Sequence, residues 1–180
     1  MNIKTNNLIL NFSNEEIKTG KPSIFLAGPT KRNGNVKESW RKDAWNYLKK
    51  KKFDGIVYIP EYINEPFNKN LVEKQCLWER QALENASCIL FWIPRDIEND
   101  MPAFTTNVEF GTYLQRKPKQ IVYARPDNAE KMTYLDWLWN FEQKKEQPIY
   151  NSLEDGLDAA ISIAYNDYNS PRLRNFFYCL

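Results

Sequence analysis

Two segments of the chain carry the side chains best suited to chemistry. Residues 78–83 contain Glu79, and residues 101–111 contain Glu109. The chain has no histidine, which excludes serine–histidine–aspartate triads, cysteine–histidine pairs and zinc sites of the HExxH type. Carboxylates, tyrosines or lysines must therefore carry any proton transfer. A well-placed, ionised carboxylate also suits nucleophilic attack on a glycosidic carbon.

Both glutamates also have a structural interpretation. Thr106 and Glu109 have the spacing of a capping box, in which a threonine caps a helix and the glutamate three residues later bonds back to it. A carboxylate in the first turn of a helix lies in positive dipole potential, which favours its ionised form. The structural and catalytic interpretations of Glu109 are therefore compatible. Glu79 taken alone is typical of a solvated helix residue.

The elements around these segments predict a parallel sheet. Short apolar runs indicate buried strands at residues 23–27, 55–60, 88–93 and 120–124, after a short edge strand within residues 3–12. The remaining hydrophobic spacing predicts helices over residues 36–50 and 69–86, from near Thr106, and near residues 128–142 and 152–166. Buried strands that alternate with helices are typical of an α/β fold, with a parallel sheet covered on both faces.

The carboxyl ends of these strands are the expected place for a ligand. Those ends are Gly28-Pro29, Pro60-Glu61, Pro94-Arg95 and Arg125-Pro126. Arginines directly after a strand are candidate ligands for phosphate or carboxylate groups. A surface ion pair is the simpler interpretation of each arginine taken alone.

Composition narrows the classes of function. The length fits a single domain over residues 1–180, with the motifs concentrated in residues 23–137. A net charge of +2 does not indicate a nucleic-acid polymer as partner. No stretch approaches the roughly 20 apolar residues of a membrane span. Three cysteines without a CxxC pattern indicate a reducing compartment, so we expect a cytoplasmic protein.

Common nucleotide and metal motifs are missing from the sequence. Gly28 and Gly34 are too far apart for a GxGxxG turn, and no GxxxxGK[ST] segment is present. The sequence therefore excludes a Rossmann dinucleotide site and a P-loop. Three cysteines are too few for a four-cysteine zinc site. We expect neither a metal nor a cofactor.

Taken in order, the motifs resemble the nucleoside 2-deoxyribosyltransferase-like family, over about residues 23–137. The resemblance is most specific from Ile89 to Gly111. The other matching segments are Ile24 to Pro29, Ser39-Trp40-Arg41, Trp78-Glu79-x-x-Ala82-Leu83, Arg125-Pro126 and Tyr134-Leu135.

The resemblance implies a flavodoxin-like (Rossmann-like) fold and transfer of 2'-deoxyribose between nucleobases. Glu109 matches the family nucleophile that attacks C1', forming a covalent deoxyribosyl intermediate. Glu79 matches the carboxylate that protonates the leaving base and later deprotonates the acceptor. The ligands are a nucleoside, nucleotide or nucleobase. The residues expected to line the pocket are Gly28, Pro29, Trp40, Arg41, Arg95, Thr106, Asn107 and Arg125.

Three positions depart from the family pattern. Phe25 replaces a tyrosine, Ser87 replaces an aspartate, and the loop at residues 101–103 lacks the aspartate that reads the base. The base preference of the family therefore does not carry over to this chain.

Two other functions remain open at this point. One is hydrolysis of the N-glycosidic bond of a nucleoside or deoxynucleotide 5'-monophosphate, with water in place of the acceptor base and with Arg41, Arg95 or Arg125 as the ligand of a 5'-phosphate. The other is a non-catalytic nucleotide-binding module on the same fold. We also expect a homo-oligomer, to which the aromatic residues 176–178 could contribute.

Overall fold

A parallel sheet of five strands forms the centre of the computed structural model, which describes residues 7–30, 39–63, 71–144 and 146–170. The strand order is β1-β3-β2-β4-β5, and each neighbouring pair of described strands runs parallel. The strands are β1 (Ile9–Phe12), β2 (Ser23–Ala27), β3 (Ile56–Ile59), β4 (Cys88–Trp92) and β5 (Ile121–Ala124).

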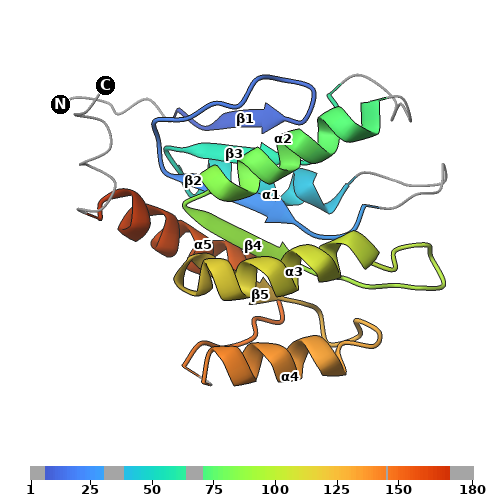
Figure 1. The fold of residues 1–180 in the computed structure, drawn as a ribbon. Coiled ribbons are helices and arrows are strands. Elements are labelled where there is room, and N and C mark those ends of the chain that lie inside the picture. Colours follow the sequence, from blue (N-terminus) through green and yellow to red (C-terminus); the bar gives the residue numbers. More distant parts are fainter. Residues whose placement is uncertain (1–6, 31–38, 64–70, 145, 171–180) are drawn as a thin grey trace.

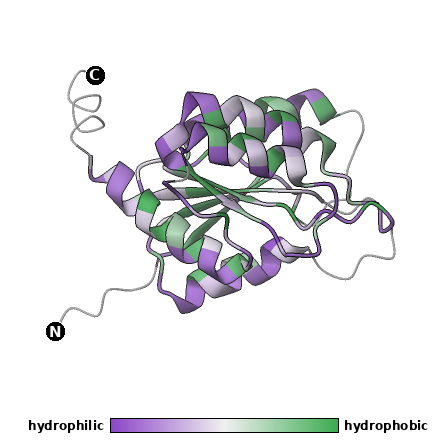
Figure 2. Cartoon of the chain, turned by 90° about the horizontal axis from the view of Figure 1, so that it is seen from below, coloured by the Kyte–Doolittle hydropathy of each residue, from purple (hydrophilic) through white to green (hydrophobic). Residues whose placement is uncertain are grey.

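Helices cover both faces of the sheet (Figures 1 and 2). One face carries α1 (Trp40–Lys50) and α5 (Leu153–Tyr168). The other carries α2 (Val72–Asn85), α3 (Phe104–Arg116) and α4 (Thr133–Glu142). The predicted α/β class with a doubly covered parallel sheet is confirmed. None of the described helices is both long and apolar enough to cross a membrane.

Alternation along the strands explains the two hydrophobic layers. In β2, Phe25 and Ala27 pack on the α2–α3–α4 side, whereas Ile24 and Leu26 pack on the α1–α5 side. Every residue of β2 is buried. Strands covered on both faces need continuous apolar runs, which is why these runs were visible in the sequence.

The strand order is that of a flavodoxin-like fold with one added strand. The order β3-β2-β4-β5 continues through an isolated parallel bridge between Ala124 and Tyr150, and β1 extends the opposite edge beside β3. The chain passes from β2 to β3 on one side, and α2 then returns it to β4 on the other side of β2. The carboxyl ends of β2 and β4 therefore flank the topological switch point, where open α/β sheets bind ligands.

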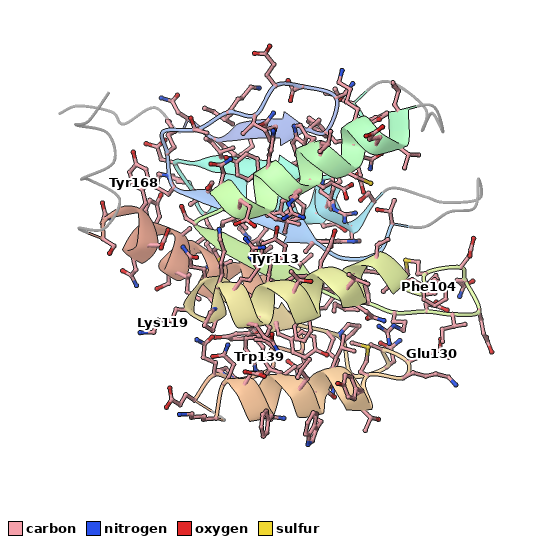
Figure 3. The ribbon with its side chains drawn as sticks, viewed as in Figure 1. Phe104, Tyr113, Lys119, Glu130, Trp139 and Tyr168 are labelled. Carbon is pink, nitrogen blue, oxygen red and sulfur yellow. The ribbon has the colours of Figure 1, made fainter. Side chains whose placement is uncertain are left out.

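The helices α2 and α3 lie side by side on the sheet. Tyr113 projects from α3 toward α2 (Figure 3), and its hydroxyl lies 3.3 Å from a carboxylate oxygen of Glu84. Arg116 of α3 forms an ion pair of 2.7 Å with the same carboxylate. Lys117, just after α3, donates hydrogen bonds to backbone oxygens at the end of α2. These contacts fix the spacing between the helices that carry Glu79 and Glu109.

The predicted capping box at the start of α3 is wrong. The helix begins at Phe104, its N-cap Ala103 has a left-handed backbone (φ 60°), and no described side chain caps it. Thr106 is the third residue of the helix and is buried on the same stripe as Phe110 and Tyr113. Burial of this stripe extends the helix toward its N-terminus, so Glu109 lies in the second turn.

Other predicted bounds shift by a few residues. The fourth helix starts at Thr133 and not near residue 128, and Gln120 belongs to a short 3-10 helix and not to β5. The edge strand occupies only Ile9–Phe12 of the predicted residues 3–12. The aromatic residues 176–178, expected to contribute to an oligomer, lie outside the described residues.

Candidate active site

Gly28, in the turn after β2, packs directly against the end of β4. A Cβ atom at this position would lie 2.1 Å from the carbonyl oxygen of Trp92 and 2.8 Å from the ring of Trp40. Only glycine fits between these groups. The indole nitrogen of Trp40 donates a 3.0 Å hydrogen bond to the carbonyl oxygen of Pro29, which fixes the turn after β2. The sequence-predicted residues Gly28, Pro29 and Trp40 therefore lie together.

Arg41 is buried directly beneath this turn, with 1% of its surface exposed. Its guanidinium donates to the carbonyl oxygens of Leu26 (3.0 Å) and Gly28 (2.7 Å). It also donates to the hydroxyl of Thr30 (3.0 Å) and to a carboxylate oxygen of Glu61 (2.7 Å). These four bonds use most of the five guanidinium donors. Arg41 thus holds the end of β2 and is poorly placed to bind a phosphate.

Glu61 joins the end of β3 to the start of α1, and sequence reasoning did not select it. The hydroxyl of Ser39, the N-cap of α1, donates a 2.7 Å hydrogen bond to Glu61. The same carboxylate oxygen accepts the bond from Arg41. The available signal was its position, since Glu61 follows Pro60 at a predicted strand end.

Glu79 projects from the middle of α2 and is half-buried. Burial raises the pKa of its carboxyl, while a hydrogen bond from Gln75 and the charge of Arg41 act in the opposite direction. The bond from Nε2 of Gln75 to Oε1 of Glu79 measures 2.8 Å. Glu79 is therefore held by a neighbour on its own helix, and a solvated surface role does not describe it.

Glu109 is half-buried on α3 and interacts electrostatically with Glu79 and Arg41. Burial raises the pKa of its carboxyl to about 7, the negative charge of Glu79 adds to this rise, and the positive charge of Arg41 opposes it. The expectation that the helix dipole keeps Glu109 ionised is wrong. The residue lies beyond the first turn, in a site where desolvation and a second carboxylate dominate.

Arg95 and Asn107 are bonded to each other. One terminal nitrogen of Arg95 donates to the side-chain oxygen of Asn107, and the other donates to the carbonyl oxygen of Lys131 at 2.8 Å. The Arg95 Nε is buried and finds no partner among the described residues. Asn107 and Glu109 are two residues apart, so they project about 200° apart around α3. The structure therefore places Arg95 and Asn107 on a different side of α3 from Glu109.

Arg125 forms a two-pronged ion pair with Asp136 of α4. The two bonds measure 2.9 Å from Nε and 2.8 Å from a terminal nitrogen. The hydroxyl of Tyr123 donates to the same carboxylate at 2.8 Å. The ion-pair interpretation of Arg125 is confirmed, and its guanidinium is occupied. Within the described residues, no three acidic, cysteine or histidine side chains are grouped as in a metal site.

Comparison with protein families matches residues 21–128 to the family described as nucleoside 2-deoxyribosyltransferase like. The chain belongs to this family. The match covers more than half of the nucleoside 2-deoxyribosyltransferase-like chain and confirms the resemblance seen in its motifs. No curated protein matches it.

The matched region of this nucleoside 2-deoxyribosyltransferase-like chain contains every residue predicted for the site. It begins just before β2 and ends after β5, so it includes the switch point, α1, α2 and α3. The added strand β1 and the helices α4 and α5 lie outside it. Tyr134-Leu135, which resembles the family pattern, also falls beyond the match.

Proposed function

We propose that this chain cleaves the N-glycosidic bond of a 2'-deoxynucleoside or deoxynucleotide and transfers the deoxyribose to a second nucleobase. One observation carries the proposal. Glu79 and Glu109 project from adjacent helices and are half-buried, the charge of Glu79 raises the pKa of Glu109, and both carboxyl groups interact with the buried Arg41. Membership of the family supports the same reaction class.

In the proposed mechanism, the two carboxyl groups have different roles. Glu109 attacks C1' of the sugar as the bond from C1' to the base nitrogen breaks, and Glu79 donates its proton to the departing base. The sugar passes through an oxocarbenium-like state, whose positive charge is stabilised by the Glu109 carboxylate. A second base then attacks C1' of the glycosyl ester while Glu79 removes its proton. Two displacements retain the configuration at C1'.

The protonation of the pair supports these roles. Both carboxyl groups have a raised pKa, and that of Glu109 lies at about 7. Near neutral pH the pair therefore retains a proton, as a mechanism with one carboxylate and one carboxylic acid requires. The cation that forms on the sugar favours the state in which Glu109 is ionised and Glu79 holds the proton.

Arg41 and Arg125 are engaged, which favours an unphosphorylated donor over a 5'-monophosphate, whereas the Nε of Arg95 has no partner among the described residues. Arg41 is bonded to the end of β2 and to Glu61, and Arg125 is bonded to Asp136. Cleavage of the N-glycosidic bond of a 5'-monophosphate by water, one form of the hydrolase alternative drawn from the sequence, would require a cation free to bind the phosphate. A non-catalytic binding module would not require two half-buried carboxyl groups whose desolvation is unfavourable.

The test is incubation with deoxyinosine, deoxyuridine, deoxycytidine and their monophosphates, with and without free adenine. Chromatography measures released base and new deoxyadenosine. We expect deoxyadenosine from at least one donor, with a loss of about 1,000-fold or more in Glu109→Ala. The control Glu73→Ala removes an exposed carboxylate from the first turn of α2 and should remain active. Release of base without exchange would identify a hydrolase, and no turnover by folded protein would disprove the proposal.

A further inference from the structure

Arg41 is surrounded by more negative charge than it can balance. The carboxyl groups of Glu61, Glu79 and Glu109 all interact electrostatically with its guanidinium. If all three were ionised, the cluster would hold one positive and three negative charges. Burial of uncompensated charge is strongly unfavourable, so such a cluster retains protons.

The hydrogen bonds show which carboxylate holds the arginine. Glu61 accepts a bond of 2.7 Å from Arg41 and another of 2.7 Å from Ser39. The other bonds of the guanidinium go to neutral oxygens of Leu26, Gly28 and Thr30. Among the described carboxylates, only Glu61 accepts a hydrogen bond from Arg41. Glu79 and Glu109 experience the arginine through space, without a direct bond.

We propose that Glu61 is a positioning residue that neutralises Arg41 and thereby keeps a proton within the Glu79–Glu109 pair. Without a negative charge at position 61, the charge of Arg41 would stabilise both remaining carboxylates. The pair would then lose its proton at a lower pH and would lack a general acid near neutral pH. The consequence for turnover rests on the proposed function, whereas the consequence for protonation does not.

The charged groups facing the pair come from each neighbouring element. In the described part of the chain, Arg41 of α1 acts on both carboxyl groups, Glu79 of α2 acts on Glu109 of α3, and Glu61 at the end of β3 acts on Arg41. Gln75 contributes a neutral amide. Loss of the charge at Glu61 removes a negative charge and frees a positive one, so both effects favour ionisation of the pair.

The test is Glu61→Gln, which retains an oxygen to accept bonds from Ser39 and Arg41 but removes the charge. Carbon-detected NMR titration of the glutamate carboxyl groups measures the protonation of Glu79 and Glu109 without any substrate. We expect their titration midpoints to fall by about one pH unit. The pH optimum of base exchange should move to lower pH by a similar amount. A titration identical to that of the wild type would overturn the proposal.

A matched control separates this effect from a general change in charge. Glu73→Gln removes an exposed carboxylate from the first turn of α2, and it should leave both midpoints unchanged. If Glu61→Gln does not fold, Glu61→Asp shortens the side chain and weakens its bond to Arg41. We expect a smaller shift in the same direction, and an absent or opposite shift would count against the proposal. Shifted midpoints in a protein without exchange activity would disprove only the proposed function.

Discussion

Gln75 donates a hydrogen bond of 2.8 Å to Glu79, one turn further along α2. This bond stabilises the ionised carboxylate and opposes the effect of burial on the pKa of Glu79. The side-chain oxygen of Gln75 is buried and has no hydrogen-bond partner within the described part of the chain. The amide is therefore oriented by Glu79.

Replacement of this amide should change the acid–base behaviour of the site. In Gln75→Leu, we expect the pKa of Glu79 to rise further, because the bond that opposes burial is lost. The alkaline limb of the pH–rate profile for base exchange should move to higher pH, with a fall of about tenfold in kcat at neutral pH. The exposed Gln81→Leu on the same helix is the control. An unchanged profile in Gln75→Leu would show that the amide has no such role.

Neutralisation of Glu109 should stabilise the fold at alkaline pH. The pKa of Glu109 is about 7 in the folded chain, compared with roughly 4.3 for an ordinary glutamate. Folding thus favours its protonated form, and the stability this contributes is present at acid pH and lost as pH rises through 7. The amide in Glu109→Gln does not ionise. As pH rises from 4 to 8, the unfolding free energy of this variant should therefore increase by on the order of 3 kcal/mol relative to that of the wild type.

Urea denaturation at several pH values measures this difference in unfolding free energy. The exposed Glu73→Gln on α2 is the control for the loss of one negative charge. A difference between Glu109→Gln and the wild type that does not change with pH would contradict a raised pKa at this position. Glu109→Gln should also be inactive, because an amide cannot replace the carboxylate that the proposed mechanism uses as its nucleophile.

Gly28, in the turn after β2, and Gly111, within α3, should respond oppositely to alanine. Gly28→Ala places a methyl group 2.1 Å from the Trp92 carbonyl oxygen, so the ends of β2 and β4 must separate. We expect Gly28→Ala to lower the unfolding free energy by about 3 kcal/mol or more. Gly111 lies within α3, and a Cβ there meets nothing within 4 Å. Gly111→Ala should raise the unfolding free energy by about 0.5–1 kcal/mol, because alanine has a higher helix propensity than glycine. Thermal unfolding of both variants measures this contrast. Equal changes in their unfolding temperatures would refute it.

Arg125 should behave as a structural residue. Arg125→Met removes both bonds to Asp136 and leaves that carboxylate with only the hydroxyl of Tyr123 among the partners described here. We expect a loss of about 1–3 kcal/mol in unfolding free energy. KM should change equally for a deoxynucleoside and its 5'-monophosphate. A selective loss of affinity for the monophosphate would instead identify Arg125 as a phosphate ligand.

The sequence by itself was sufficient to predict the fold class and the family. Parallel strands covered on both faces require continuous apolar runs, and runs such as residues 23–27 and 88–92 are fully buried as expected. Glycine and proline at the strand ends mark sharp turns, and the spacing of the motifs around Glu79 and Glu109 is local in the chain. Patterns of this kind depend on short stretches of sequence, so they can be recognised without knowing how the elements pack.

Only the tertiary structure decided which partner each charged side chain binds. Whether Arg41, Arg95 and Arg125 are free or engaged depends on partners from other elements, namely Glu61, Asn107 and Asp136. The start of α3 was mispredicted because the burial of Thr106 outweighed its capping pattern. The raised pKa of Glu109 likewise follows from desolvation and from the charge of Glu79 on α2, which outweigh the opposing charge of Arg41 on α1. Electrostatic free energies depend on distance and burial, which spacing along a chain does not encode.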